Sequence, residues 1–140
     1  MSDRYFLDTN IIIYSFDGSN PSKQAIAREL IERGLSKQNG CISYQVVQEF
    51  ANVATRKFTV PLSHDDCRQY IENILQPLWK IYSSRELVNR SLDVSERWLY
   101  SFYDALIIAA ALEASCSVLY SEDLQHKQKI YSLQIINPFA

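Results

Sequence analysis

Short apolar segments alternate with longer amphipathic segments along this chain, and the alternation restricts the fold more than any other feature. The apolar segments predict strands at residues 4–7, 41–42, 79–82, 117–120 and 134–136. The segments between them carry apolar residues every three or four positions, which predicts helices. Strands that alternate with helices form a parallel sheet with helices on both faces. We therefore expect an α/β fold.

Capping residues mark the ends of the predicted helices. Asn20, followed by proline, opens the first helix, and Gly34 closes it. Ser43 is placed to cap a second helix, and Ser63 a third that ends at Pro77. The second half of the chain adds a helix that starts with a capping box at residues 83–86 and runs to about residue 94. The strongest helical pattern covers residues 104–114.

Composition excludes several classes of protein. The 140 residues suffice for one domain, which we expect to span 1–140. A net charge of −2 argues against a broad basic surface that coats nucleic acid. The three cysteines are widely spaced and odd in number, which predicts free thiols in a reducing compartment. The longest apolar run, residues 105–112, is much shorter than the ~18 residues of a membrane span. We expect a cytoplasmic protein without membrane association.

Four acidic residues fall at related positions of this frame. Asp8 follows the first strand, and Asp123 follows the strand at 117–120. Asp104 lies in the first turn of the strongest helix, and Glu49 lies two turns into the helix that follows the second strand. Ligands of open α/β sheets bind at the carboxyl ends of the strands. The four carboxylates are therefore expected to converge on one cleft.

Each acid also has an ordinary explanation when it is taken alone. Asp8 and Asp123 suit a cap or a turn, and Asp104 suits the positive end of a helix dipole. Glu49 would pair with a basic residue two turns later, Arg56. Convergence is less ordinary, because several carboxylates in one cleft repel one another unless a cation lies among them. An all-oxygen set without histidine or cysteine favours Mg²⁺ or Mn²⁺ over zinc.

Four short motifs occur in order along nearly the whole chain: LDTN, QEF, YDALIIAAAL and SEDLQH. Together they resemble the four motifs of PIN domains, and more closely those of VapC-type toxins of toxin–antitoxin pairs. The resemblance implies an α/β/α sandwich around a central parallel sheet and a metal-dependent endoribonuclease. It assigns catalysis and metal binding to Asp8, Glu49, Asp104 and Asp123, with Thr9 in a supporting role.

The resemblance also implies partners and marks two departures. The partners are an RNA substrate, an antitoxin protein that covers the cleft, and a second copy in a homodimer. Many PIN domains carry another acid shortly after the fourth one; here Glu122 is the nearest acid and ranks second to Asp123 for that role. Similar toxins often have glycine after the histidine, where this chain has Lys127.

Three other interpretations remain open from the sequence. One is an RNA-processing nuclease of the same fold that has no antitoxin. Another is a non-catalytic module that binds RNA or protein, although such a module would be expected to have lost one of the four acids. A receiver-type signalling domain fits less well, because receivers place paired acids after the first strand, where this chain has Asp8 and Thr9.

Overall fold

The computed structural model describes residues 2–140. Its strands are short and most of its helices are two to four turns long. In chain order the elements are β1 (Tyr5–Leu7), α1 (Thr9–Tyr14), α2 (Pro21–Ser36), β2 (Gly40–Ser43), α3 (Tyr44–Arg56), α4 (His64–Tyr70), the π-helix η1 (Ile71–Leu75), α5 (Gln76–Leu78), β3 (Trp79–Ile81), α6 (Arg85–Trp98), α7 (Phe102–Glu113), β4 (Val118–Tyr120), β5 (Lys129–Ile130) and β6 (Leu133–Ile136).

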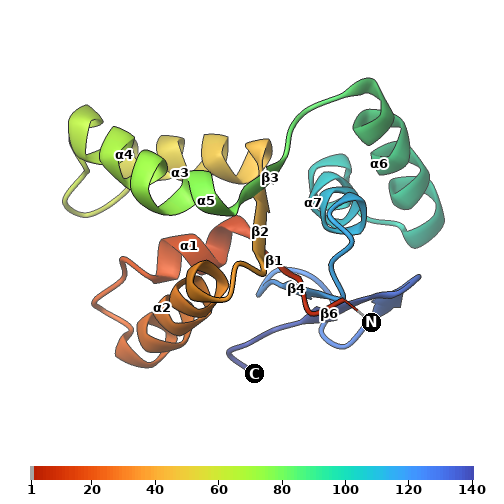
Figure 1. The fold of residues 1–140 in the computed structure, drawn as a ribbon, viewed down its shortest axis with the longest axis horizontal. Helices are drawn as coiled ribbons and strands as arrows, with labels where there is room; N and C mark the ends of the chain where they lie inside the picture. The colour runs from red at the N-terminus through yellow and green to blue at the C-terminus, as the bar shows by residue number, and fades with distance from the viewer. Residues whose placement is uncertain (1) are drawn as a thin grey trace.

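The strands form one sheet in the order β3-β2-β1-β4-β6-β5. All neighbouring pairs are parallel except β5 and β6, which form a short antiparallel pair at one edge. Helices α1 and α2 lie on one side of the sheet, and α6 and α7 lie on the other (Figure 1). The expected α/β architecture is confirmed, and the antiparallel edge strand β5 is the addition that the sequence pattern missed.

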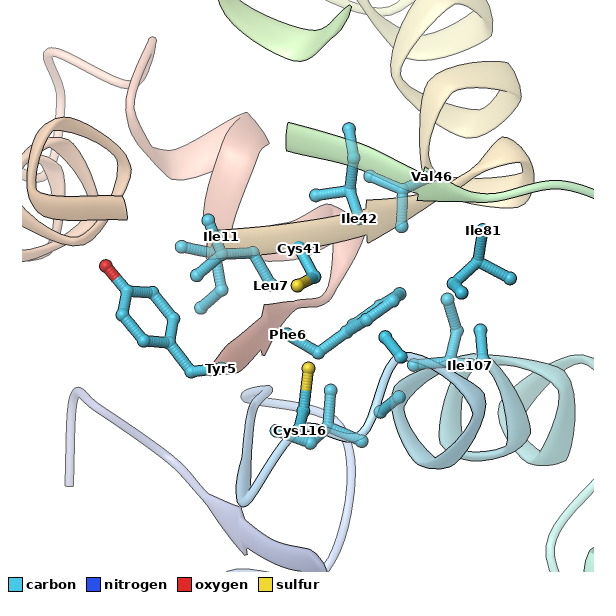
Figure 2. Close-up of a cluster of buried hydrophobic side chains, with 14 of the residues drawn as sticks. Tyr5, Phe6, Leu7, Ile11, Cys41, Ile42, Val46, Ile81, Ile107 and Cys116 are labelled. Atoms are coloured by element: carbon cyan, nitrogen blue, oxygen red, sulfur yellow. The ribbon is translucent and has the colours of Figure 1, made fainter. Parts of the chain in front are cut away.

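Strand β1 lies at the centre of the sheet and is buried along its whole length. Successive side chains of a strand point to opposite faces. Phe6 accordingly extends toward Ile107 of α7, whereas Tyr5 points to the other side (Figure 2). There the Tyr5 hydroxyl donates a hydrogen bond of 2.6 Å to the carbonyl oxygen of Leu30 in α2. Both faces of β1 are thus anchored, which holds the residue that follows it, Asp8, in a defined position.

The three cysteines form no disulfide, as the sequence predicts. Cys41, Cys67 and Cys116 are free and buried. Cys41 and Cys116 lie near Phe6 in the cluster between the sheet and α7 (Figure 2). Among residues 2–140, no helix combines the length and apolar character that a membrane crossing requires.

Two helix ends differ from the prediction. Helix α2 does not stop at Gly34 but continues to Ser36. Gly34 instead lets the helix pass close to β2, because a Cβ there would lie 3.0 Å from the Cα of Gly40. Helix α6 is capped by Ser84, whose side chain accepts from the amide of Leu87, one residue later than expected, and it runs to Trp98. Preferences at helix ends are local, and packing in three dimensions overrides them at both places.

The segment 64–78 was predicted as one regular helix that ends at Pro77. It is a helical segment interrupted by the π-helical turn η1, and Pro77 lies within its last turn, α5. Proline cannot donate a backbone hydrogen bond, and its ring collides with the carbonyl four residues earlier in an α-helix. A wider π-turn immediately before a proline relieves that collision.

Replacement of Gly40 by alanine tests the helix–strand crossing. The new Cβ would lie 2.9 Å from the Cα of Gly34 and 3.0 Å from Leu78. Because backbone must move, Gly40→Ala is expected to lower the free energy of unfolding by about 1–3 kcal/mol, measured by urea denaturation. Gly18→Ala is the matched control, since nothing lies within 4 Å of its Cβ position. A loss in Gly18→Ala equal to that in Gly40→Ala would contradict the crossing argument.

Candidate metal and nuclease site

A cleft of about 390 Å³ opens at the carboxyl ends of β1 and β4. It lies between the start of α1, the middle of α3 and the start of α7. All four acids predicted from the sequence line it: Asp8, Glu49, Asp104 and Asp123. The sheet brings the first and last of these together, because β1 and β4 are adjacent parallel strands although 113 residues separate Asp8 from Ser121.

Asp8 is the most buried of the four acids, at 8% exposure. It is the N-cap of α1, and its Oδ1 accepts a hydrogen bond of 2.7 Å from the amide of Thr9. Its Oδ2 accepts from Ser121 Oγ at 2.7 Å and from Asn10 Nδ2 at 3.3 Å. The capping role and the place in the cleft therefore coincide, so the two interpretations of Asp8 do not exclude each other.

Thr9 connects the first acid to the second. Its hydroxyl donates to Glu49 Oε1 at 2.6 Å, which joins the start of α1 to α3. Gln45, one turn earlier in α3, donates to Glu49 Oε2 at 3.4 Å and to the carbonyl of Tyr103 at 3.2 Å. Glu49 takes part in none of the ion pairs found in residues 2–140, so the alternative pairing with Arg56 is not formed.

The other two acids enter the cleft from α7 and from the loop after β4. Asp104 lies in the first turn of α7, where the side chain of Ser101 accepts from its backbone amide. Asp123 Oδ2 accepts a hydrogen bond of 3.0 Å from Asn10 Nδ2, and its amide donates to Ser121 Oγ at 3.2 Å. Asn10 thus contacts both Asp8 and Asp123.

Glu122 points elsewhere. It forms an ion pair with Lys23 and accepts a hydrogen bond of 2.6 Å from Tyr14 Oη. These two contacts lower the pKa of its carboxyl group, with Lys23 the larger cause. Glu122 is not among the residues that line the cleft. The position of Glu122 therefore does not support it as the alternative to Asp123 for the fourth acid of the cleft.

Burial and neighbouring charge act together on Asp8. Desolvation is the main cause that raises its pKa to about 6, and the carboxylates of Asp123 and Glu49 raise it further. The hydrogen bonds from Ser121 and Thr9 oppose the rise. A carboxylate in this state is stabilised by a nearby cation, which reverses the repulsion from its neighbours.

The oxygen atoms that line the cleft are of the chemical type that a hard divalent cation prefers. They are carboxylate oxygens, supported by the hydroxyl of Thr9, and no histidine or cysteine lines the cleft. Within residues 2–140, no three acidic, histidine or cysteine side chains lie close enough together to ligate one ion directly. Mg²⁺ commonly takes one or two carboxylates and keeps several water molecules, which matches this spacing.

Sequence reasoning missed Ser121 and Gln45. Ser121 is fully buried and holds both Asp8 and the loop that carries Asp123. A polar residue directly after a buried strand was its only signal. Gln45 lies four residues before Glu49, a spacing that places the two side chains on one helix face.

Comparisons with known proteins agree with this arrangement. The family model described as the PIN domain matches residues 5–129. The match covers most of the chain, so the chain belongs to the PIN domain family. A comparison with curated protein sequences finds no significant match.

Solved structures share the fold at low sequence identity. A toxin–antitoxin complex from Klebsiella pneumoniae matches with a TM-score of 0.68 at 20% identity, over 96% of this chain and 97% of that one. FitAB bound to the IR36 DNA fragment matches with a TM-score of 0.72 at 16% identity, over 97% and 96%. Mycobacterium tuberculosis VapC20, described as a sarcin–ricin loop cleaving toxin, matches with a TM-score of 0.60 at 16% identity, over 85% and 89%.

The raised pKa of Asp8 predicts a pH-dependent stability of the metal-free protein. The folded state keeps the Asp8 proton up to about pH 6, whereas the unfolded chain releases it near 3.8. The folded state therefore binds more protons in this window, and its free energy of unfolding falls as pH rises from 4 to 7. The two-unit difference corresponds to about 3 kcal/mol.

Urea denaturation in a chelator, at several pH values between 4 and 7, measures this effect in wild type and Asp8→Asn. The variant should gain about 2 kcal/mol relative to wild type between pH 4 and pH 7, because the unfolded carboxyl group is already partly ionised at pH 4. A stability difference that does not change with pH would show that Asp8 ionises normally.

Proposed function

We propose that this protein is a metal-dependent endoribonuclease that hydrolyses phosphodiester bonds of RNA. The observation that carries the proposal is the convergence of four carboxylates from β1, α3, α7 and the loop after β4 on one cleft. PIN domains are nucleases, and the chain belongs to that family. A structural neighbour is described as cleaving the sarcin–ricin loop, which supports RNA as the substrate class.

In this proposal Asp8, Glu49, Asp104 and Asp123 hold one or two Mg²⁺ or Mn²⁺ ions. A metal held there would supply an activated water and would neutralise charge on the phosphate. Thr9 orients Glu49 through its hydroxyl, and Asn10 orients Asp123. The burial of Asp8 makes it a strong electrostatic partner for the ion, because charges interact more strongly away from water.

A positive side chain also borders the cleft. Lys57 lines it next to the acids and is exposed at the end of α3. In the proposed reaction it attracts the phosphate backbone of the substrate to a cleft that would otherwise repel it. The helix C-terminus offers a second reason for a basic residue at this position.

We further propose that the protein is the toxin of a type II toxin–antitoxin pair. Support comes from the neighbour described as a toxin–antitoxin complex, which matches this chain over nearly its full length. The antitoxin would occupy the acidic cleft, and the toxin would act on RNA in the cytoplasm as a homodimer. Expression with and without the adjacent gene product separates this proposal from an RNA-processing nuclease, because only a toxin needs the partner for cell growth.

Cleavage of a single-stranded RNA panel tests the nuclease directly. Wild-type protein should cut with Mg²⁺ or Mn²⁺ and stop in a chelator. Asp8→Asn and Asp104→Asn should each lower the rate by roughly 100-fold or more, because each removes a proposed ligand. Asp93→Asn, an exposed acid on α6, is the matched control and should retain full activity.

Cleavage that persists in Asp8→Asn would reject the assigned site. Folded protein that cuts none of the panel, with metal present and antitoxin absent, would favour the non-catalytic binding module. Circular dichroism of each variant distinguishes a lost function from a lost fold.

Metal binding is tested separately from activity by thermal denaturation. Mn²⁺ at 100 times its dissociation constant should stabilise the wild type by about 2.7 kcal/mol. The stabilisation should be much reduced in Asp8→Asn and unchanged in Asp93→Asn. Equal stabilisation of all three proteins would show that the ion binds outside the cleft.

A further inference from the structure

Three aromatic rings are stacked at the edge of the sheet. Trp79 opens the edge strand β3, Tyr44 opens α3, and Tyr82 follows β3 directly. The ring centroids of Tyr44 and Trp79 are 5.9 Å apart, and those of Trp79 and Tyr82 are 5.2 Å apart, both at an interplanar angle of 28°. We call these three residues the aromatic ladder. Their geometry is the offset stacking that aromatic rings prefer.

The outer rings of the aromatic ladder are open to solvent. Tyr82 is 62% exposed and Tyr44 is 41% exposed. Trp79, between them, is half-buried and packs against the core. The ladder therefore presents flat aromatic surface to solvent on a rigid base.

The aromatic ladder lies next to an apolar groove that borders the acidic cleft. An apolar groove of about 160 Å³ is lined by Tyr44, Leu87, Phe102 and Leu106 among others, and Gln45 lines both this groove and the acidic cleft. At its other end the groove shares lining residues with an open hollow at the start of α6, which is lined by Arg85. Through these shared lining residues, a path leads from the acidic cleft past the ladder's Tyr44 to the exposed Arg85.

The charges along this path suit a polyanion with exposed bases. No acidic side chain lines the groove or the hollow at the start of α6 in the part of the chain that the structure describes. Arg85 lines the hollow and is exposed. Flat aromatic faces stack on any nucleobase, whereas the bases of a duplex are already stacked on one another.

We propose that the aromatic ladder and the groove beside it hold unpaired nucleobases of the substrate strand, next to the phosphate that lies among the four acids. The proposal deepens the proposed function, on which it rests, by assigning the surface that binds the bases of the substrate strand. Aromatic stacking then supplies affinity with little sequence preference, and Arg85 contacts a phosphate further along the strand.

Equilibrium binding of a fluorescein-labelled 12-nucleotide oligoadenylate tests this assignment. The Asp8→Asn background prevents cleavage during the measurement. Tyr44→Ala and Tyr82→Ala should each weaken binding by roughly 5- to 100-fold, the range that loss of one stacked base produces. Tyr82→Trp keeps a stacking face and should bind at least as well as the parent. Tyr131→Ala is the matched control, because Tyr131 is 63% exposed but lies in the turn between β5 and β6.

An abasic oligomer of the same length separates stacking from charge. Its binding should be weaker than that of oligoadenylate and indifferent to Tyr44→Ala and Tyr82→Ala. Equal effects of these changes on both oligomers, or no effect on either, would overturn the proposal. So would conversion of a dimer to a monomer by Tyr82→Ala without any base-dependent loss, since the ladder would then be a contact between two copies of the chain.

The result also separates this proposal from the nuclease. If RNA binding depends on the aromatic ladder but the protein cuts no RNA, the base-binding surface is supported and the nuclease proposal is rejected. If the protein cuts RNA with metal but its RNA binding does not depend on the aromatic ladder, the nuclease proposal is supported and the base-binding surface is rejected.

Discussion

The carboxylate of Asp8 is the point on which the cleft depends. It accepts hydrogen bonds from Thr9, Ser121 and Asn10, so one buried acid joins the end of β1, the start of α1 and the end of β4. Burial of a charge is costly, and these bonds offset only part of that cost, as the raised pKa shows. The electrostatic imbalance that remains is what makes the cleft receptive to a cation.

Two neighbouring acids in the loop after β4 meet different surroundings. Asp123 faces the cleft, held by Asn10, whereas Glu122 turns to Lys23 and Tyr14. The ion pair of Glu122 and the hydrogen bond of Ser121 hold the two residues that precede the exposed acid. Glu122 is therefore neutralised by its ion pair, whereas Asp123 remains available in the cleft. The loop thus contributes one negative charge to the cleft and not two.

Most of the fold and the four acids could be predicted because their signals are local. Apolar periodicity marks strands and helices, and the carboxyl ends of parallel strands indicate where ligands collect. Gly34 was misjudged because a helix end and a close crossing with Gly40 look alike in sequence. Ser121 and Gln45 were missed because hydrogen bonds between distant segments leave no periodic trace. The aromatic ladder escaped notice for the same reason, since Tyr44 and Trp79 are far apart along the chain.

The position of β4 between β1 and β6 also has a consequence for synthesis on the ribosome. A nascent chain that ends before residue 118 already carries three of the four acids, yet β1 has one open edge and Asp8 lacks Ser121. Pairing across such a sequence separation is slow to form and comes late in folding. The acids therefore share one cleft only after the last quarter of the chain has been made, so incomplete translation products are expected to be inert.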